Sequence, residues 1–225
     1  MTWFTAKVNS ASGNVENYSE PTSKVVCVGR NYVEHAKELN NPVPKRPLLF
    51  IKPNTSLIDL SSGITLPAGE TNCHHELEVA VLIGSRLTKA KESDVCAGIV
   101  GLGLALDLTL RDEQTALKQK GQPWERAKAF DGSCPITAFL PWEGEQALND
   151  IAFSMNKNGE VAQAGNTADM LFPIVPLIME ISQHFTLLPG DIVLTGTPEG
   201  VGPLSAGDQL DLALLGQPWE NTTVS

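Results

Sequence analysis

The chain alternates between short apolar segments and turn-forming residues along most of its length. It contains 19 glycines and 15 prolines, which fall mainly between the apolar segments. This punctuation is typical of a β-rich domain with many turns. We expect strands over residues 25–28, 48–51, 77–83, 99–108, 192–195 and 209–214. The last two follow Pro-Gly-Asp and Ala-Gly-Asp turns, and this pair resembles successive strands of a barrel or roll.

Three segments carry the pattern of a helix instead. Residues 31–39 place Tyr32, His35, Ala36 and Leu39 on one face, and residues 173–185 do the same with Ile174, Leu177, Ile178 and Ile181. A third helix is predicted over residues 110–120, with Thr109 as its N-cap. The predicted fold class is therefore mixed α+β, β-rich, with few helices. Because no linker or repeat divides the chain, we expect one domain over residues 24–225 and an N-terminal appendage over residues 1–23.

Composition limits the kinds of partner. The chain has 225 residues, 42% of them hydrophobic, which is enough for a full core in one domain. Its net charge of −10 argues against nucleic acid and against an anionic membrane surface, because both attract a basic face. The first residues do not resemble a signal peptide, and no apolar run reaches the roughly 18 residues that span a bilayer, so a cytoplasmic location is expected. The four cysteines form no Cys-x-x-Cys pair, which favours reduced, mostly buried thiols.

Two glutamates precede an apolar run in the segment Cys-His-His-Glu-Leu-Glu-Val-Ala-Val-Leu-Ile-Gly, residues 73–84. Side chains alternate faces along a strand, so Glu76 and Glu78 point to the same side. Asp107 interrupts a second apolar segment. Three carboxylates on apolar strands suit one Mg²⁺ ion, which prefers oxygen ligands. An edge strand with a solvated acidic face is the alternative, and His74 and His75 leave a transition-metal site as another.

A histidine and a glutamate form a second candidate pair. His35 and Glu38 lie three residues apart in a predicted helix and are therefore neighbours on its surface. A carboxylate beside an imidazole fixes the tautomer and stabilises the protonated ring, which suits a general base that activates water. A surface ion pair is the alternative interpretation.

Cationic and amide side chains lie near the acidic motifs in the sequence. They are Arg30, Lys52, Arg111, Gln114 and Lys128. They are candidate donors to an anionic substrate, and charge balancing in an acidic chain is the alternative. The glycine- and threonine-rich segment 194–202 could place Thr197 and backbone N–H groups around a carboxylate. A tight corner after a strand is the alternative there, and the segment lacks the Gly-Lys-Ser/Thr of a Walker loop.

Eight motifs occur in an order that resembles the fumarylacetoacetate hydrolase family across residues 24–215. They are Gly29-Arg30-Asn31-Tyr32 with His35 and Glu38, Phe50-Ile51-Lys52-Pro53, His75-Glu76-Leu77-Glu78, Asp107-Leu108-Thr109 with Arg111 and Gln114, Lys128-Ala129-Phe130-Asp131, Asn158-Gly159-Glu160, Asn166-Thr167 with Met170, and Thr195-Gly196-Thr197-Pro198 with Gly200-Val201-Gly202. The length resembles the small acylpyruvate hydrolase and oxaloacetate decarboxylase branch.

The resemblance implies a β-roll around a metal site, and a homodimer. By matched position it makes Glu76, Glu78 and Asp107 the ligands of Mg²⁺, with Mn²⁺ as substitute. It makes His35 and Glu38 a water-activating pair on a segment that orders into a lid in relatives, and Arg111, Gln114 and Lys128 contacts to the substrate, with Lys52, Thr197 and Arg30 in support. The further upstream metal-binding carboxylate of the larger fumarylacetoacetate-cleaving enzymes has no counterpart in this sequence, which argues against fumarylacetoacetate as the substrate.

The function implied is that of a Mg²⁺-dependent enzyme acting on small 2-oxo acids through a metal-bound enolate. Acylpyruvate hydrolysis, with cleavage of a carbon–carbon bond, and oxaloacetate decarboxylation are the leading reactions. The alternatives are an isomerase or tautomerase of a 2-oxo or 2-hydroxy-dienoic acid, and a homologue that binds metal without catalysis. His35 and Lys128 are the predicted catalytic residues, together with Glu38.

Overall fold

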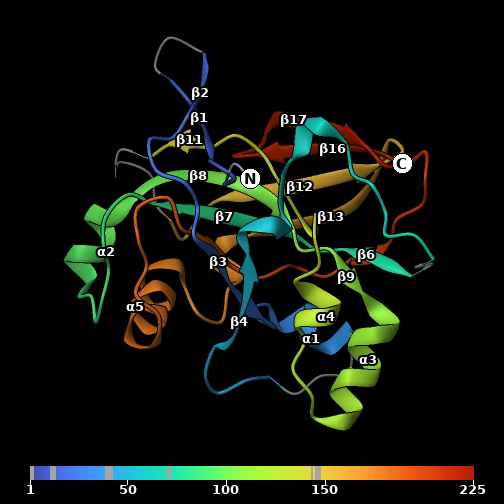
Figure 1. Ribbon diagram of the computed structural model, residues 1–225, viewed down its shortest axis with the longest axis horizontal. Coiled ribbons are helices and arrows are strands. Elements are labelled where there is room, and N and C mark those ends of the chain that lie inside the picture. The colour runs from blue at the N-terminus through green and yellow to red at the C-terminus, as the bar shows by residue number, and fades with distance from the viewer. Residues whose placement is uncertain (1–2, 11–13, 39–42, 70–71, 143, 145–147) are drawn as a thin grey trace.

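The chain folds around one large β-sheet, flanked by smaller sheets and helices (Figure 1). The computed structural model describes residues 3–10, 14–38, 43–69, 72–142, 144 and 148–225, and every statement about structure concerns these residues. Within them the mixed α+β, β-rich class predicted from the sequence is confirmed.

The large sheet has eight strands of mixed direction. In spatial order they are β4 (Leu48–Pro53), β3 (Lys24–Gly29), β14 (Ile192–Leu194), β7 (Leu77–Ile83), β8 (Ile99–Leu106), β10 (Cys134–Ile136) and β5 (Leu57–Asp59), with β11 (Leu140–Pro141) pairing to β8 off this path. Strand β14 pairs parallel with β3 and antiparallel with β7. Segments from both ends of the chain therefore meet at the centre of the sheet.

A second sheet of four antiparallel strands packs on the large one. Its strands are β13 (Glu160–Asn166), β12 (Ala152–Lys157), β16 (Gln209–Leu214) and β17 (Gln217–Thr223). Strand β12 contacts β7, and β16 contacts β8. On β16, Leu210, Leu212 and Leu214 are buried while the residues between them are more exposed, the alternation expected of a strand with one face on a core.

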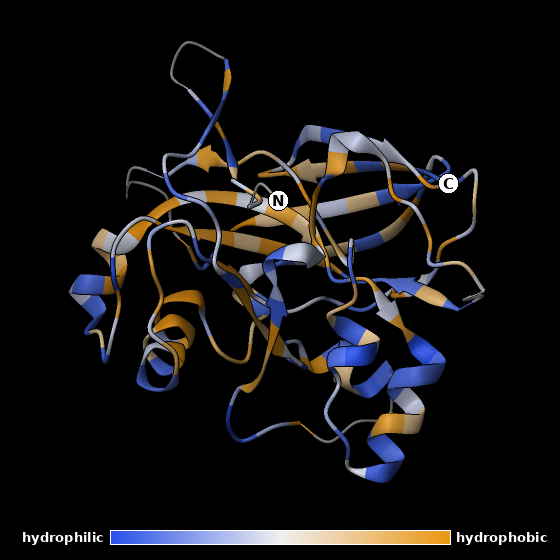
Figure 2. Ribbon diagram, in the orientation of Figure 1, coloured by the Kyte–Doolittle hydropathy of each residue, from blue (hydrophilic) through white to orange (hydrophobic). Residues whose placement is uncertain are grey.

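Helices and short elements complete the fold. The helices are α1 (Val33–Glu38), α2 (Glu92–Gly98), α3 (Arg111–Lys120), α4 (Glu125–Lys128) and α5 (Ile174–His184), with 3₁₀ turns η1 (Asn54–Ser56), η2 (Leu60–Ser62) and η3 (Thr167–Asp169). The remaining strands are β15 (Gly202–Pro203), β6 (Cys73–His75) and β9 (Thr109–Leu110), which form a three-stranded sheet, and the hairpin β1 (Lys7–Asn9) with β2 (Val15–Asn17). Helix α5 buries its apolar face, whereas α3 is mainly hydrophilic (Figure 2).

Both faces of the large sheet are buried, which explains why β7 reads as an unbroken apolar run after its glutamate. One face, which includes Val79 and Val81, joins the core formed with the four-stranded sheet and α5. The other face, which includes Ala80 and Leu82, is covered in part by Ala6 of the N-terminal segment. Strand alternation therefore gives each face its own core.

Several expectations about local structure need correction. The predicted strand 99–108 ends at Leu106, and the predicted helix begins at Arg111. Thr109 is not the N-cap, because it belongs to β9 and its hydroxyl bonds the Asp107 carbonyl; Leu110 takes the capping position without a side-chain bond. The predicted strands 192–195 and 209–214 exist as β14 and β16 but lie in different sheets.

The remaining expectations concern helix ends and whole segments. Pro173 precedes α5 as its N-cap, and Leu39 lies outside the described residues. Strands β12 and β13 were not predicted. The division into an appendage over residues 1–23 and a domain over 24–225 stays a prediction. Cys27, Cys73 and Cys134 are buried and Cys96 is exposed, all four as free thiols. None of the described helices combines the length and apolarity that crossing a bilayer requires.

Candidate active site

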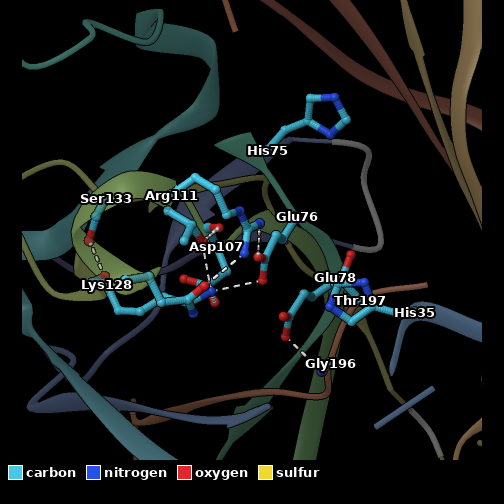
Figure 3. A network of polar contacts seen from close by, with 12 residues as sticks. His35, His75, Glu76, Glu78, Asp107, Arg111, Lys128, Ser133, Gly196 and Thr197 are labelled. Carbon is cyan, nitrogen blue, oxygen red and sulfur yellow. Dashed lines mark hydrogen bonds and ion pairs between the residues drawn. The ribbon is translucent and has the colours of Figure 1, made fainter. Parts of the chain in front are cut away.

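The strands that carry the three acidic residues are neighbours in the large sheet. Glu78 on β7 pairs with Ala105 on β8. The hydrogen bonding between these two segments continues past the ends of both strands, because the Asp107 N–H donates to the Glu76 carbonyl at 2.8 Å. Alternation from Ala105 puts Asp107 on the face of Glu78, and Glu76 joins them. One carboxylate oxygen from each residue lies within 4.8 Å of the other two, and all three residues are buried. Figure 3 shows the three carboxylates close together.

The carboxylates lie where the two strands leave the large sheet. Glu76 sits in the break between β6 and β7, just before the predicted strand 77–83, and Asp107 directly follows β8, whereas the sequence predicts Asp107 within the strand 99–108. The reason is that β6 and β9 pair with each other in the three-stranded sheet, so the β7–β8 ladder passes to a second sheet at this point. The polar side chains of Glu76 and Asp107 therefore lie where the chain passes from the β7–β8 pair to the β6–β9 pair.

Three cationic side chains surround the acidic group. Lys128 Nζ lies 2.8 Å from Glu76 Oε2 and 2.5 Å from Asp107 Oδ2. Arg111 Nη2 lies 2.6 Å from Glu76 Oε1, and Lys52 Nζ lies 2.8 Å from Asp107 Oδ1. Burying an unpaired charge is costly, so three positive charges beside three negative ones keep the cluster tolerable inside the protein.

The pKa values of two of these residues follow from this pairing. Burial acts to raise the pKa of Glu76, but the charges of Lys128 and Arg111 outweigh burial and hold the pKa well below its usual range. Burial acts to lower the pKa of Lys128, but the charges of Asp107 and Glu76 outweigh it and raise the pKa. Glu76 and Lys128 are therefore held as an ion pair.

Glu78 differs from the other two carboxylates. Its one hydrogen bond within the described part of the chain comes from the Gly196 N–H, 2.6 Å from Oε2, and no described cation forms an ion pair with it. Burial raises the pKa of Glu78 well above its usual range, and the charge of Asp107 raises it further, against the opposing effect of Lys128. A buried carboxylate in this state gains most from an added cation.

This donor set fits a hard divalent cation. Three carboxylate oxygens converge, and among the described residues no donor reaches Asp107 Oδ1 with good hydrogen-bond geometry, although the Lys52 ammonium lies nearby. Mg²⁺ and Mn²⁺ both take such oxygen ligands and leave further positions to water or substrate. The carboxylates that could hold the ion are Glu76, Glu78 and Asp107.

The two histidines beside Glu76 do not join this group. His75 Nδ1 lies 2.9 Å from Gln163 Oε1, and Figure 3 shows the ring pointing away from the carboxylates. His74 Nε2 lies 2.8 Å from Asn72 Oδ1. In the described residues the cluster with metal-ligand spacing contains carboxylates alone, which favours the oxygen-ligand alternative over the transition-metal one.

The predicted histidine–glutamate pair is formed on α1. His35 Nδ1 lies 3.2 Å from Glu38 Oε2, and the other carboxylate oxygen accepts a hydrogen bond from the Gly200 N–H at 3.0 Å. A carboxylate beside Nδ1 places the proton on that nitrogen, so Nε2 keeps its lone pair. Because His35 is buried, this pair is not an ordinary surface ion pair.

A small cavity of about 30 Å³ lies beside the carboxylates. Its lining consists of Gly29, Arg30, His35, Phe50, Glu76, Arg111, Gln114, Lys118, Trp124 and Lys128. Six of these are predicted site residues, brought together from α1, α3, α4 and the ends of β3 and β7. Arg111 Nη1 donates to Gln114 Oε1 at 2.7 Å, and the Arg30 guanidinium lies 5.9 Å from the centre of the Trp124 ring. A cavity of this size suits one water molecule, so a larger ligand requires the walls to move.

Lys52 and Thr197 lie outside this lining. Lys52 is fully buried and contacts the site through Asp107 and through the Lys128 carbonyl, with further bonds to the Ser133 carbonyl at 3.1 Å and hydroxyl at 3.0 Å. Thr197 lies directly after Gly196 on the loop that follows β14 and accepts a hydrogen bond from Gln163.

The sequence pattern did not identify three residues with direct roles in this network, Thr109, Ser133 and Gln163, and it did not single out Gly196 within the segment 194–202, whose backbone N–H groups were expected around a carboxylate. Thr109 accepts a hydrogen bond from Lys128 at 2.7 Å, and its position two residues after Asp107 was the available signal. The glycine in the Thr-Gly-Thr segment was a comparable signal for Gly196. Gln163 carried no signal, because it lies on a strand that the sequence pattern did not reveal.

Comparisons with known proteins place this site in context. The model of the fumarylacetoacetate (FAA) hydrolase C-terminal family matches residues 24–224. The chain is 52% identical over 199 residues to oxaloacetate tautomerase YcgM of Escherichia coli strain K12, covering 87% of this chain and 90% of that protein. It is 40% identical over 207 residues to human mitochondrial oxaloacetate tautomerase FAHD1, covering 92% and 94%.

A solved structure is also similar along its whole length. The crystal structure of fumarylpyruvate hydrolase from Pseudomonas aeruginosa, in complex with Mn²⁺ and pyruvate, matches with a TM-score of 0.89 at 29% identity. The match covers 100% of this chain and 97% of that one. The predicted β-roll, rich in strands with few helices, agrees with this likeness.

Proposed function

The chain belongs to the fumarylacetoacetate hydrolase family of metal-dependent enzymes, and on that premise we propose that it is an oxaloacetate tautomerase. The single observation that carries the proposal is the buried cluster of Glu76, Glu78 and Asp107 beside three cationic side chains. Such a cluster suits a small dianion that develops further negative charge during reaction. The names of relatives at 52% and 40% identity support oxaloacetate as that dianion.

The three carboxylates are proposed to hold Mg²⁺, with Mn²⁺ as substitute, because both ions prefer oxygen ligands. The related fumarylpyruvate hydrolase structure, which contains Mn²⁺ and pyruvate, supports this choice of ion class and of ligand. When bound, the ion would polarise the 2-oxo group and neutralise charge that builds on its oxygen. Glu78 gains most from the ion, since no cation among the described residues forms an ion pair with it.

Cationic and amide side chains are proposed to orient the substrate. Lys128 and Arg111 already touch the carboxylates, and Gln114 accepts a hydrogen bond from Arg111, so all three can donate to an anion placed beside the cluster. Donors aimed at the oxygen where negative charge develops lower the barrier to enolisation. Arg30, which lines the same cavity, and Thr197 are proposed to contact the carboxylate groups.

Proton transfer is proposed for His35. Keto–enol conversion removes a proton from carbon 3 of oxaloacetate and delivers one to the 2-oxo oxygen. His35 Nε2 keeps a lone pair because Nδ1 faces Glu38, and the ring lines the cavity. Glu38 stabilises the ring in its protonated form and holds its orientation. Because the cavity is small, helix α1 is proposed to move away when the substrate enters and to return over it.

Acylpyruvate hydrolysis is a second candidate, favoured by the same histidine–glutamate pair and by the fumarylpyruvate hydrolase likeness. In that reaction His35 would take a proton from water, the hydroxide would attack the distal carbonyl, and cleavage of the carbon–carbon bond would release a carboxylic acid and the enolate of pyruvate. Oxaloacetate decarboxylation gives the same enolate when CO₂ departs. The three reactions therefore share enolate stabilisation and differ in what is removed from the substrate.

One panel of assays separates these reactions. Purified protein with Mg²⁺ is tested for decay of enol-oxaloacetate by ultraviolet absorbance, for CO₂ release from oxaloacetate, and for hydrolysis of acetylpyruvate and fumarylpyruvate. We expect the tautomerisation rate to be the largest, above a matched blank with Mg²⁺ alone. Fast hydrolysis of an acylpyruvate without accelerated tautomerisation would show that the proposed function is wrong.

Variants add a second test. His35→Asn is expected to lower tautomerisation by a factor of at least about 100, the usual range for loss of a general base. An unchanged rate would remove His35 as the base. The homodimer and the cytoplasmic location stay predictions, and light scattering of the purified protein tests the first of them.

A further inference from the structure

The side-chain amide of Gln163 joins three segments of the chain beside the site. Gln163 lies on β13 and is almost completely buried. Its Oε1 accepts from the Leu77 N–H and lies near His75 Nδ1, both at 2.9 Å. Its Nε2 donates to Thr197 Oγ1 at 2.8 Å and to the Pro198 carbonyl at 3.1 Å. All four hydrogen-bonding positions of the amide are therefore used.

The orientation of this amide follows from its backbone partners. The Leu77 N–H can only donate, and the Pro198 carbonyl can only accept, so Oε1 must face Leu77 and Nε2 must face Pro198. It follows that His75 donates from Nδ1. It also follows that Thr197 Oγ1 is the acceptor in its bond with Gln163.

This leaves the hydrogen of the Thr197 hydroxyl for another partner. Since Oγ1 accepts from Gln163, the O–H must point elsewhere, and no acceptor for it is found in the described part of the chain. Thr197 lies next to Gly196, whose N–H bonds Glu78, and on the same loop as Gly200, whose N–H bonds Glu38. Figure 3 shows Thr197 near Glu78 and His35. The unused donor therefore lies on the loop whose Gly196 N–H bonds the carboxylate cluster and whose Gly200 N–H bonds the histidine–glutamate pair.

We propose that Gln163 is a positioning residue that holds the Thr197 hydroxyl as a hydrogen-bond donor to an anionic oxygen of the bound 2-oxo acid. The inference rests on the proposed function, which supplies the contact between Thr197 and the substrate. Gln163 acts through Thr197, and its own polar atoms are all bonded to protein groups.

Gln163→Glu separates this role from a purely structural one. A glutamate keeps an oxygen for His75 and Leu77, but its second oxygen cannot donate to Thr197. The Thr197 hydroxyl would then donate to residue 163, and the substrate would lose its donor although the hydroxyl is still present. Thr197→Val removes the same donor directly. Gln183→Glu on α5 is a matched control. Gln183 is exposed, and its side chain bonds the Met179 carbonyl of its own helix and none of the residues discussed above.

The experiment measures the Kd of oxalate, an enolate mimic, by calorimetry in saturating Mg²⁺. Loss of one hydrogen bond to a charged ligand weakens binding about tenfold, so Thr197→Val and Gln163→Glu should each raise the Kd by about that factor. The double variant should bind no more weakly than Thr197→Val alone, because both changes remove one donor. The Kd of Mg²⁺ alone and the Gln183→Glu control should match wild type.

Four results would overturn the inference. Gln163 does not act through Thr197 if Gln163→Glu binds oxalate as tightly as wild type while Thr197→Val binds it more weakly. The same conclusion follows if the losses of affinity add in the double variant. Wild-type oxalate affinity in Thr197→Val would show that the Thr197 hydroxyl does not donate to the ligand, and it would leave the proposed function intact. Absence of Mg²⁺-dependent oxalate binding in the wild type would overturn the proposed function together with the inference.

Folding is checked separately, because Gln163→Glu introduces a charge at a buried position. If that variant does not fold, Gln163→Met replaces it, since methionine has a similar length and no charge. Gln163→Met frees the Thr197 hydroxyl to rotate, and a Kd about threefold higher is expected. This loss should again disappear in the Thr197→Val background, and a loss that persists there counts against the inference.

Discussion

Asp191 and Glu78 are buried carboxylates at opposite ends of the paired strands β7 and β14, and they are stabilised in different ways. Asp191 precedes β14 and receives hydrogen bonds from the N–H and hydroxyl of Ser23, the N–H groups of Lys24 and Leu188, and the Lys24 ammonium. Within the residues that the structure describes, Glu78 receives one hydrogen bond, from the Gly196 N–H just beyond the other end of β14. One strand thus connects a saturated carboxylate with an undersaturated one.

The difference distinguishes a structural group from a functional one. Every lone pair that the Asp191 carboxylate presents has a donor from the protein, so nothing is left for a ligand to supply. Glu78 has neither a cation nor a second donor among the described residues, and burial raises its pKa. The proposed divalent ion would supply the positive charge that the described residues do not place beside Glu78.

Glu78→Gln should have the largest effect of the variants compared here, and that effect is on activity. Glutamine keeps an oxygen for the Gly196 N–H but removes the anionic ligand, so metal-dependent activity should fall by a factor of at least about a thousand, comparable to the loss of a principal electrostatic contribution to catalysis. The metal-free melting temperature should change little, since no ion pair is lost. Tautomerisation kinetics measure the activity, and thermal denaturation without metal measures the melting temperature. Glu92→Gln on the exposed side of α2 is the control, and retained activity in Glu78→Gln would remove Glu78 as a ligand.

Asp191→Ala should have the converse effect. It leaves five donors without their acceptor, including the Lys24 ammonium, and we expect the free energy of unfolding to fall by about 3–5 kcal/mol. Urea denaturation measures this loss. Activity per folded molecule and the Kd of Mg²⁺ should stay at wild-type values. A variant with normal stability and impaired Mg²⁺ binding would reverse the roles assigned to the two carboxylates.

Ligand addition sharpens the comparison with a smaller effect. With Mg²⁺ and oxalate each at about 100 times its Kd, the wild type should gain about 2.7 kcal/mol from each ligand, a rise in melting temperature of about 5–10 °C for each. Asp191→Ala should show the same rise from a lower starting temperature, and Glu78→Gln should show none. Chelation with EDTA should reverse the rise. No response in the wild type would favour a homologue that does not bind metal at this site.

Glu220 is a third carboxylate, less buried than Asp191 and Glu78, and replacing it should have the smallest effect on stability. It is half-buried, accepts one hydrogen bond from the Ala138 N–H at 2.6 Å, and burial raises its pKa. A carboxyl group whose pKa is higher in the folded protein costs stability as the pH rises above its unfolded value of about 4.3, and nothing below it. Glu220→Gln should therefore stabilise the protein by a few tenths of a kcal/mol at neutral pH, after solvent screening. Denaturation at several pH values measures this, and a gain that grows toward low pH would contradict it.

Much of the candidate site could be predicted because its signals are local. The Glu76-Leu77-Glu78 alternation places two carboxylates on one side of a chain whatever they pack against, and the spacing of His35 and Glu38 makes them neighbours on any helix. Asp107 was a candidate because it interrupts a second apolar segment, and the ordered motifs then assigned Arg111 and Lys128 to the substrate through resemblance. The strands with continuous apolar runs, such as β7 and β14, were found for the same reason, since burial on both faces leaves a clear pattern.

The remainder depends on which segments meet in space. Strand β13 mixes buried, intermediate and exposed positions without a simple alternation, so Gln163 could not be placed beside Thr197. The break at Glu76 and the early end of β8 arise because both strands pass to the three-stranded sheet, which no local pattern records.

The sequence by itself determined which side chains share a face, because alternation along a strand and the turn of a helix are properties of a few consecutive residues. Only the tertiary structure decided which carboxylates are paired. Among the described residues, Lys128 and Arg111 reach Glu76, five donors reach Asp191, and Glu78 receives a single backbone N–H. Each of these outcomes depends on the packing of segments distant in the chain, and the electrostatic energy of a buried charge is set by those neighbours.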